Sequence, residues 1–148
     1  MSKTLVITGS SRGIGYALVQ LASAAGHQVY ALSRNISTIK KTNLVHPFSI
    51  DITVKNSLES FVDQIQKDGV QIDALINNAG ALINKPFSET TTEDFFSVYH
   101  VNIIGLASLT RILLPLIILV TLISYGSFLF SNYVMPIANL KNGSMIYD

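Results

Sequence analysis

A glycine-rich turn near the N-terminus carries the residues best placed for chemistry. Its glycines are separated by three residues and then by one, in the order Gly9, Gly13 and Gly15. Glycines let a ligand approach the main chain closely, and a helix that begins in such a turn presents free N–H groups to an anion. The turn therefore predicts a pyrophosphate site, formed by Gly9, Ser10, Ser11, Arg12, Gly13, Ile14 and Gly15. An ordinary strand-to-helix turn without a ligand is the alternative.

The elements that must position this turn follow from hydrophobic periodicity. Short apolar runs predict strands at residues 3–8, 29–33, 47–50 and 72–76. Helical spacing predicts helices at residues 13–25, 53–67, 92–99 and 102–114, with Thr53 and Thr92 as N-caps. The helix at residues 13–25 should bury an apolar face formed by Ile14, Ala17, Leu18, Leu21, Ala22 and Ala25. The helix at residues 53–67 should bury a face formed by Leu58, Phe61, Val62 and Ile65. This alternation predicts one α/β domain with a doubly wound, Rossmann-like parallel sheet.

Composition limits the classes of partner and site. Ten basic against nine acidic residues leave a net charge of +1, too small to favour nucleic acid as a partner. Cysteine is absent, and His27, His46 and His100 lack the spacing of metal ligands, so neither a disulfide nor a metal site is expected. The first residues enter a strand pattern without an apolar signal-peptide core, which makes the cytoplasm the expected compartment.

Three further motifs follow the glycine turn along the sequence. Asp51-Ile52 follows the third predicted strand, Asn77-Asn78-Ala79-Gly80 follows the fourth, and His100-Val101-Asn102 lies further on. With the G-x-x-x-G-x-G turn, they make residues 3–115 resemble the short-chain dehydrogenase/reductase family.

The resemblance implies a role for each of these motifs. It implies a nicotinamide dinucleotide site that includes Asp51, Ile52, Asn78, Ala79 and Gly80, and a catalytic contribution from Asn102. It also implies hydride transfer to or from a small alcohol or carbonyl substrate, and a possible homo-oligomer.

The end of the second predicted strand indicates which dinucleotide is bound. NAD-binding proteins usually carry an acidic residue there for the ribose 2′-hydroxyl, whereas this chain has Ser33-Arg34-Asn35. The Arg34 guanidinium could pair with a 2′-phosphate, with Arg12 closing from the glycine turn. We therefore expect NADP, with Ser33 and Arg34 in its site. The alternative is that Arg34 is a solvated residue at a strand end.

The catalytic motif of the family is the main departure. Its members use a serine and a Y-x-x-x-K pair, but here Tyr99, Tyr125 and Tyr133 are followed four positions later by isoleucine, leucine and isoleucine. Ser124 could be the family serine if residues 119–123 form the fifth strand, although a serine without catalytic role is the alternative. We expect an NADP-dependent oxidoreductase impaired by C-terminal incompleteness. A non-catalytic NADP-binding protein and a non-functional gene fragment are the alternatives.

The C-terminal part is unusually apolar. No charged residue occurs between Arg111 and Lys141. Residues 112–130 are nearly all apolar and long enough to span a bilayer, which needs about 20 residues, so membrane association is one expectation. The favoured expectation is a soluble one, in which residues 117–123 form a buried parallel strand.

We therefore divide the chain into an NADP-binding region, 1–116, and an apolar tail, 117–148. The tail leaves the family pattern after Tyr125, as a deletion or a shifted reading frame would explain.

Overall fold

The computed structural model describes residues 1–117, which contain a four-stranded sheet between helices. The strands are β1 (Thr4–Thr8), β2 (Gln28–Ser33), β3 (Val45–Ser49) and β4 (Ala74–Ile76), in the order β3-β2-β1-β4. All three strand pairs are parallel; Thr4 lies beside Gln28 on one side of β1, and Leu5 lies beside Ala74 on the other. The predicted parallel sheet is confirmed, with strand ends shifted by at most two residues.

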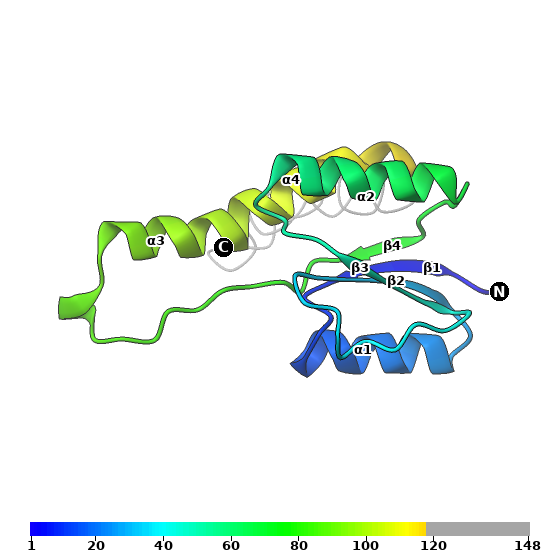
Figure 1. The fold of residues 1–148 in the computed structure, drawn as a ribbon, viewed down its shortest axis with the longest axis horizontal. Coiled ribbons are helices and arrows are strands. Elements are labelled where there is room, and N and C mark those ends of the chain that lie inside the picture. The colour runs from blue at the N-terminus through cyan, green and yellow to red at the C-terminus, as the bar shows by residue number, and fades with distance from the viewer. Residues whose placement is uncertain (118–148) are drawn as a thin grey trace, which may run out of the picture.

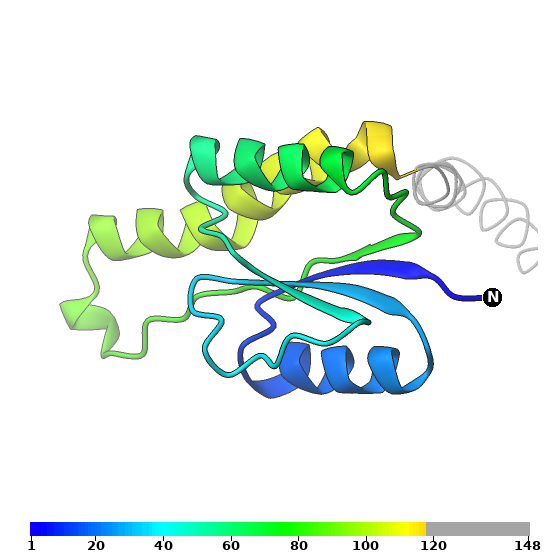
Figure 2. The ribbon, with the colours of Figure 1, turned by 45° about the vertical axis from the view of Figure 1, so that its right-hand side comes forward.

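Helices cover both faces of this sheet, as a doubly wound fold requires (Figure 1). Helix α1 (Gly13–Ala24) lies on one face, and α2 (Lys55–Lys67) and α4 (Leu106–Leu113) lie on the other. Helix α3 (Thr92–Tyr99) extends beyond the sheet, and Figure 2 shows the same arrangement from a second angle. A π-helical segment, His100–Gly105, joins α3 to α4, and short 3₁₀ turns occupy Phe87–Glu89 and Leu114–Leu116.

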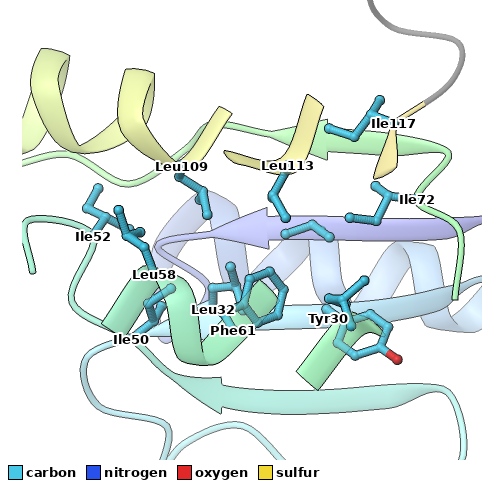
Figure 3. Close-up of a cluster of buried hydrophobic side chains, with 12 residues drawn as sticks. Tyr30, Leu32, Ile50, Ile52, Leu58, Phe61, Ile72, Leu109, Leu113 and Ile117 are labelled. Atoms are coloured by element: carbon cyan, nitrogen blue, oxygen red, sulfur yellow. The ribbon is translucent and has the colours of Figure 1, made fainter. Parts of the chain in front are cut away.

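The larger hydrophobic core lies between the sheet and the helix pair α2 and α4 (Figure 3). Phe61 from α2 is fully buried and packs edge-on against Tyr30 of β2. Leu109 and Leu113 of α4 pack in the same core. The predicted apolar face of α2 is confirmed, because Leu58, Phe61, Val62 and Ile65 all belong to this core. Burial of each large apolar side chain stabilises the fold by about 1.5–3 kcal/mol.

A second core lies under α1, and its composition corrects one expectation. Val19 is fully buried there, and Leu18 and Ala22 pack beside it. The inclusion of Ile14, Ala17, Leu21 and Ala25 in the buried face was wrong, because all four are exposed, Ile14 to 74% and Leu21 to 68%. Leu21 stands two positions from Val19, which places it on the opposite side of the helix. Ile14 lies in the first turn of α1 and belongs to neither core.

The structure also corrects both predicted N-caps. Helix α2 begins after Val54, and no side chain caps it; the Thr53 hydroxyl donates to the Asp51 carboxylate at 2.6 Å. Helix α3 is capped by Thr91 rather than Thr92, in a capping box with Asp94. The expectation of a separate helix beginning at Asn102 is wrong too. Helical structure continues from Thr92 to Leu116 through the π-helical segment, with no proline to interrupt it before Pro115.

The described chain ends beside the sheet. Ile117 is buried and forms a parallel bridge with Ile72, just before β4. Residues 118–148, with Ser124 and most of the proposed strand and membrane segment, lie outside the described part. Within it, the helix Thr92–Leu116 has 25 residues and contains an 18-residue stretch with a mean hydropathy of 1.3, so length and composition alone would permit it to cross a membrane. Leu109 and Leu113 of this helix nevertheless belong to the core.

Candidate functional site

A groove of about 700 Å³ opens at the carboxyl ends of the strands. In open parallel sheets this edge is where ligands bind. Most of the predicted cofactor residues line it, from the glycine turn, the ends of β2 and β3, and the segment after β4: Gly9, Ser11, Arg12, Gly13, Ile14, Ser33, Arg34, Asp51, Ile52, Asn78, Ala79 and Gly80. The fold therefore brings residues from four separate parts of the sequence to one site.

Two predicted residues shape the turn without lining the groove. The Ser10 hydroxyl is fully buried and donates to the Leu32 carbonyl at 2.9 Å, which ties the turn to β2. Gly15 is also buried, and a Cβ atom there would lie 2.3 Å from the Gly9 carbonyl oxygen. Because real side chains do not approach so closely, only glycine allows α1 to begin against the turn at this angle.

The glycine turn leaves room for an anion at the start of α1. Gly9 has a φ of +66°, and a Cβ there would lie 2.8 Å from the Cα of Ala79, so the turn packs directly on the segment after β4. Arg12 is the N-cap residue of α1, and no side chain caps the helix. Its first N–H groups therefore keep their capacity to bind an anion, which the positive end of the helix dipole also favours.

Hydrogen bonds lock β1 and β4 together at the floor of the groove. The Thr8 hydroxyl accepts from the main-chain N–H groups of Asn78 and Ala79, both at 2.9 Å. The Asn78 side-chain amide in turn donates to the Thr8 carbonyl at 3.0 Å and the Gly9 carbonyl at 3.2 Å. Asn78 therefore serves this site through the main chain that it holds in place.

Charge is divided along the groove between two arginines and one carboxylate. Arg12 and Arg34 are both exposed there. Asp51 accepts from the Thr53 hydroxyl and the Thr53 N–H, and these hydrogen bonds hold the pKa of the Asp51 carboxyl below its usual value. The positive charges of Arg34 and His100 act in the same direction. Asp51 is thus an ionised hydrogen-bond acceptor at neutral pH.

Asn102, the predicted catalytic residue, fastens the segment after β4 to the long helix. Its side-chain oxygen accepts from the Ala81 N–H at 2.7 Å, and its side-chain amide donates to the Ala81 carbonyl at 3.0 Å. It does not itself line the groove, although its neighbours Val101 and Ala81 do. It lies within the π-helical segment, a feature often found near functional sites. Ser124 lies outside the described residues.

Seven residues line the groove that the sequence did not identify: Thr8, Leu32, Asn35, Thr38, Ile50, Ala81 and Val101. Thr8, Leu32 and Ile50 stand at or beside strand ends. The rule that ligands bind outside the carboxyl ends of parallel strands could have found them. Asn35 and Thr38 come from the connection between β2 and β3, where no periodic pattern indicates which side chains face the groove.

Taken together, the parallel sheet, the glycine turn and the groove at the carboxyl ends of the strands define a Rossmann-like fold, the class that binds dinucleotides at this edge of the sheet. The model of the short chain dehydrogenase family matches residues 3–126. The chain therefore belongs to the short-chain dehydrogenase/reductase family.

Individual relatives agree with this assignment. A ketoacyl reductase, HetN, from Nostoc sp. is 34% identical over 76% of this chain and 42% of its own length. An NADP-dependent 3-hydroxy acid dehydrogenase from Schizosaccharomyces pombe is 29% identical over 77% of this chain and 48% of its own. A short chain dehydrogenase structure from Leptospira borgpetersenii with bound NAD+ has a TM-score of 0.71 at 29% identity, covering 75% of this chain and 44% of that one. The chain thus spans less than half the length of these relatives.

Proposed function

We propose that residues 1–117 form the NADP(H)-binding part of an oxidoreductase that acts on a small alcohol or carbonyl compound. The observation that carries the choice of NADP is the charge at the end of β2. Arg34 lines the groove there, between Ser33 and Asn35, so this strand end carries a cation where NAD-binding proteins usually carry an acidic residue. Arg12 lines the same groove from the glycine turn.

The groove residues fit the parts of such a cofactor. The glycine turn and the uncapped start of α1 would hold the pyrophosphate. Asp51 and Ile52 would lie near the adenine, and the Arg34 guanidinium would pair with the 2′-phosphate. Asn78, Ala79 and Gly80 would border the remaining part of the dinucleotide. When bound, the nicotinamide supplies or accepts a hydride; the described residues bind and orient it.

A second candidate is NADP binding without turnover by this chain on its own. No tyrosine in the 148 residues is followed four positions later by a lysine, the pair that transfers the proton in this family. Both candidates share the cofactor site and differ only in chemistry. A panel of aldehydes and ketones with NADPH separates them, since consumption of NADPH supports the oxidoreductase and binding alone supports the second candidate.

The cofactor site is tested by titrating NADPH and NADH into the purified chain and following nicotinamide fluorescence. The sequence contains no tryptophan, so indole emission does not interfere. We expect NADPH to bind more tightly than NADH.

A hydrogen bond to a charged group contributes about 1.5–3 kcal/mol, so Arg34→Ala should weaken NADPH binding by about ten- to a hundredfold and NADH binding far less. Lys40→Ala, a cation in the same connection but outside the groove, is the matched control. Equal losses for both cofactors in Arg34→Ala would contradict a 2′-phosphate contact.

A further inference from the structure

The connection between β2 and β3, residues 34–44, touches the glycine turn through one side chain. The Thr38 hydroxyl donates to the Ser11 carbonyl oxygen at 2.7 Å, and both residues line the groove. The two residues are 27 positions apart in the sequence, so this bond joins two separate walls of the site. Arg12 follows Ser11 directly, and Arg34 stands four positions before Thr38.

The rest of the connection is built to hold Thr38 in this position. Ile39, its neighbour, is 5% exposed and packs in the core under α1. The Asn35 side chain accepts from the Ser37 N–H at 2.9 Å, and the Ile39 N–H donates to the Ile36 carbonyl at 2.9 Å. These contacts give the connection a defined course although it contains no helix or strand.

In both segments that carry an arginine, a main-chain carbonyl accepts a hydrogen bond from a side-chain hydroxyl. The Arg34 carbonyl accepts from the Ser49 hydroxyl at 3.0 Å, which fastens the start of the connection to β3. The Thr38 hydroxyl fastens its middle to the turn that carries Arg12. Two guanidinium groups repel each other, and a tie between their segments opposes their separation.

We infer that Thr38 is a positioning residue for cofactor choice: its bond to the Ser11 carbonyl holds Arg12 and Arg34 on opposite sides of the dinucleotide 2′-phosphate and so raises the preference for NADPH over NADH. This inference rests on the proposed function. Thr38 acts through the arginines, because its only hydroxyl proton is already donated to Ser11 and is not free for a phosphate oxygen.

The test compares NADPH and NADH titrations of the wild-type chain, Thr38→Val and Thr38→Ser. Thr38→Val keeps the side-chain shape but loses the hydroxyl. It should weaken NADPH binding by about three- to tenfold and NADH binding by less than about twofold. Thr38→Ser keeps the donor and should bind as the wild type does. Circular dichroism and the melting temperature of each variant verify that it is folded.

A double-mutant cycle makes the test independent of packing effects. If Thr38 acts through the arginines, Thr38→Val should change NADPH affinity little once Arg12 and Arg34 are both alanine. Equal weakening of NADPH and NADH by Thr38→Val, or an unchanged effect in the double-alanine background, would overturn the inference while leaving NADP binding intact. A wild-type chain that binds neither dinucleotide would instead overturn the proposed function itself, and this inference with it.

Discussion

Thr8 and Asn78, 70 positions apart, are joined by two hydrogen bonds, both of which Asn78 donates. The Asn78 N–H donates to the Thr8 hydroxyl at 2.9 Å, and the Asn78 side-chain amide donates to the Thr8 carbonyl at 3.0 Å. The first contact fixes the main chain after β4, and the second fixes the last residue of β1. The floor of the groove is therefore a joint between the end of β1 and the segment that follows β4.

Replacing Thr8 by valine tests this joint. The hydroxyl accepts from two main-chain N–H groups, those of Asn78 and Ala79, and Thr8 is only 1% exposed. Valine has the same shape and no acceptor, so the Ala79 N–H loses its partner and the Asn78 N–H keeps only the Ile76 carbonyl, at 3.1 Å. The free energy of unfolding should therefore fall by about 1–3 kcal/mol. Urea unfolding measures the change. Thr8→Ser, which keeps the acceptor, should lose clearly less; equal losses would show that the methyl group matters instead.

Replacing Gly15 by alanine tests the close approach inside the turn. The new Cβ would meet the Gly9 carbonyl oxygen at 2.3 Å and the Asn78 side-chain nitrogen at 2.5 Å. We expect a loss of about 1–3 kcal/mol in unfolding free energy, as overpacking usually costs, and weaker NADPH binding. Gly80→Ala is the matched control for the unfolding free energy, because its Cβ would meet only Asn102, at 3.6 Å. A stable Gly15→Ala with unchanged cofactor affinity would contradict this packing.

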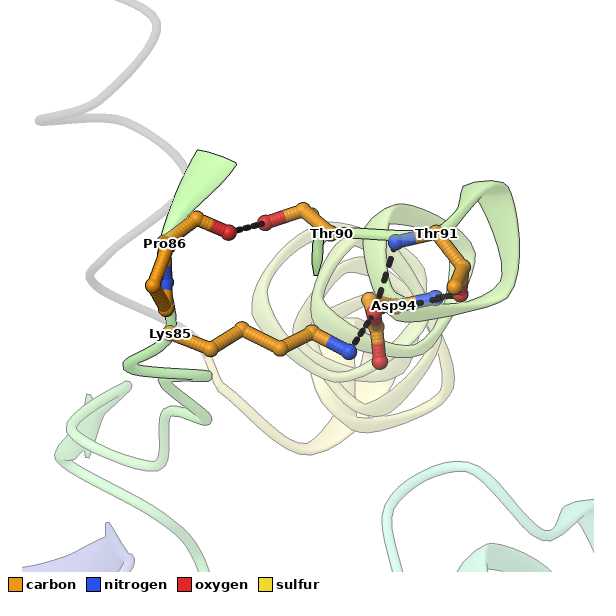
Figure 4. A network of polar contacts seen from close by, with 5 residues as sticks. All are labelled: Lys85, Pro86, Thr90, Thr91 and Asp94. Carbon is orange, nitrogen blue, oxygen red and sulfur yellow. Dashed lines mark hydrogen bonds and ion pairs between the residues drawn. The ribbon is translucent and has the colours of Figure 1, made fainter. Parts of the chain in front are cut away.

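The stability of the start of α3 should depend on pH through Asp94, whose contacts Figure 4 shows. An ion pair with Lys85 and the Thr91 N–H lower the pKa of the Asp94 carboxyl. Because the folded pKa is below the unfolded one, the contribution to stability is complete above about pH 4 and is lost as the pH falls through the folded pKa. Asp94→Asn should therefore be less stable than the wild type at neutral pH and equally stable in strong acid. A stability difference that does not change with pH would show that charge has no part in this contact.

Asn102 should control the order of the segment after β4. Its side chain both accepts from and donates to the main chain of Ala81. Asn102→Ala removes both bonds, and Asn102→Asp keeps the acceptor only. We expect the Ala81 amide to exchange its hydrogen fastest in Asn102→Ala, at an intermediate rate in Asn102→Asp and slowest in the wild type. Exchange at the Ile7 amide of β1, a buried residue of the sheet, serves as the internal reference.

Much of this site could be predicted from the sequence, because its geometry follows from main-chain requirements. The glycine spacing and the strand before it place the turn, and parallel pairing then brings Asp51 and Asn78 to the same edge of the sheet. Such features depend on residue types at fixed separations, which a single sequence displays directly.

The remainder depends on competition between neighbouring groups. Thr91 and Thr92 are equally good caps by residue type, and Asp94 decides between them because its carboxylate reaches the Thr91 N–H. Thr53 is held in a turn by the Asp51 carboxylate, which accepts from both its hydroxyl and its N–H, and α2 begins later, after Val54. Thr38 was not identified because its partner, the Ser11 carbonyl, is a main-chain atom that any residue would carry. Sequence patterns do not record choices of this kind.

The strand order also has a consequence for synthesis of the protein. Strand β1 is made first and lies inside the sheet, paired on one side with β2 and on the other with β4. On the ribosome its first edge can pair once β2 has emerged, but the second edge must wait until Ile76 leaves the exit tunnel. During that interval an apolar strand presents free N–H and C=O groups, to which a chaperone or another nascent chain can bind. Slow translation between β2 and β4 would lengthen the interval, and the yield of soluble chain should fall with it.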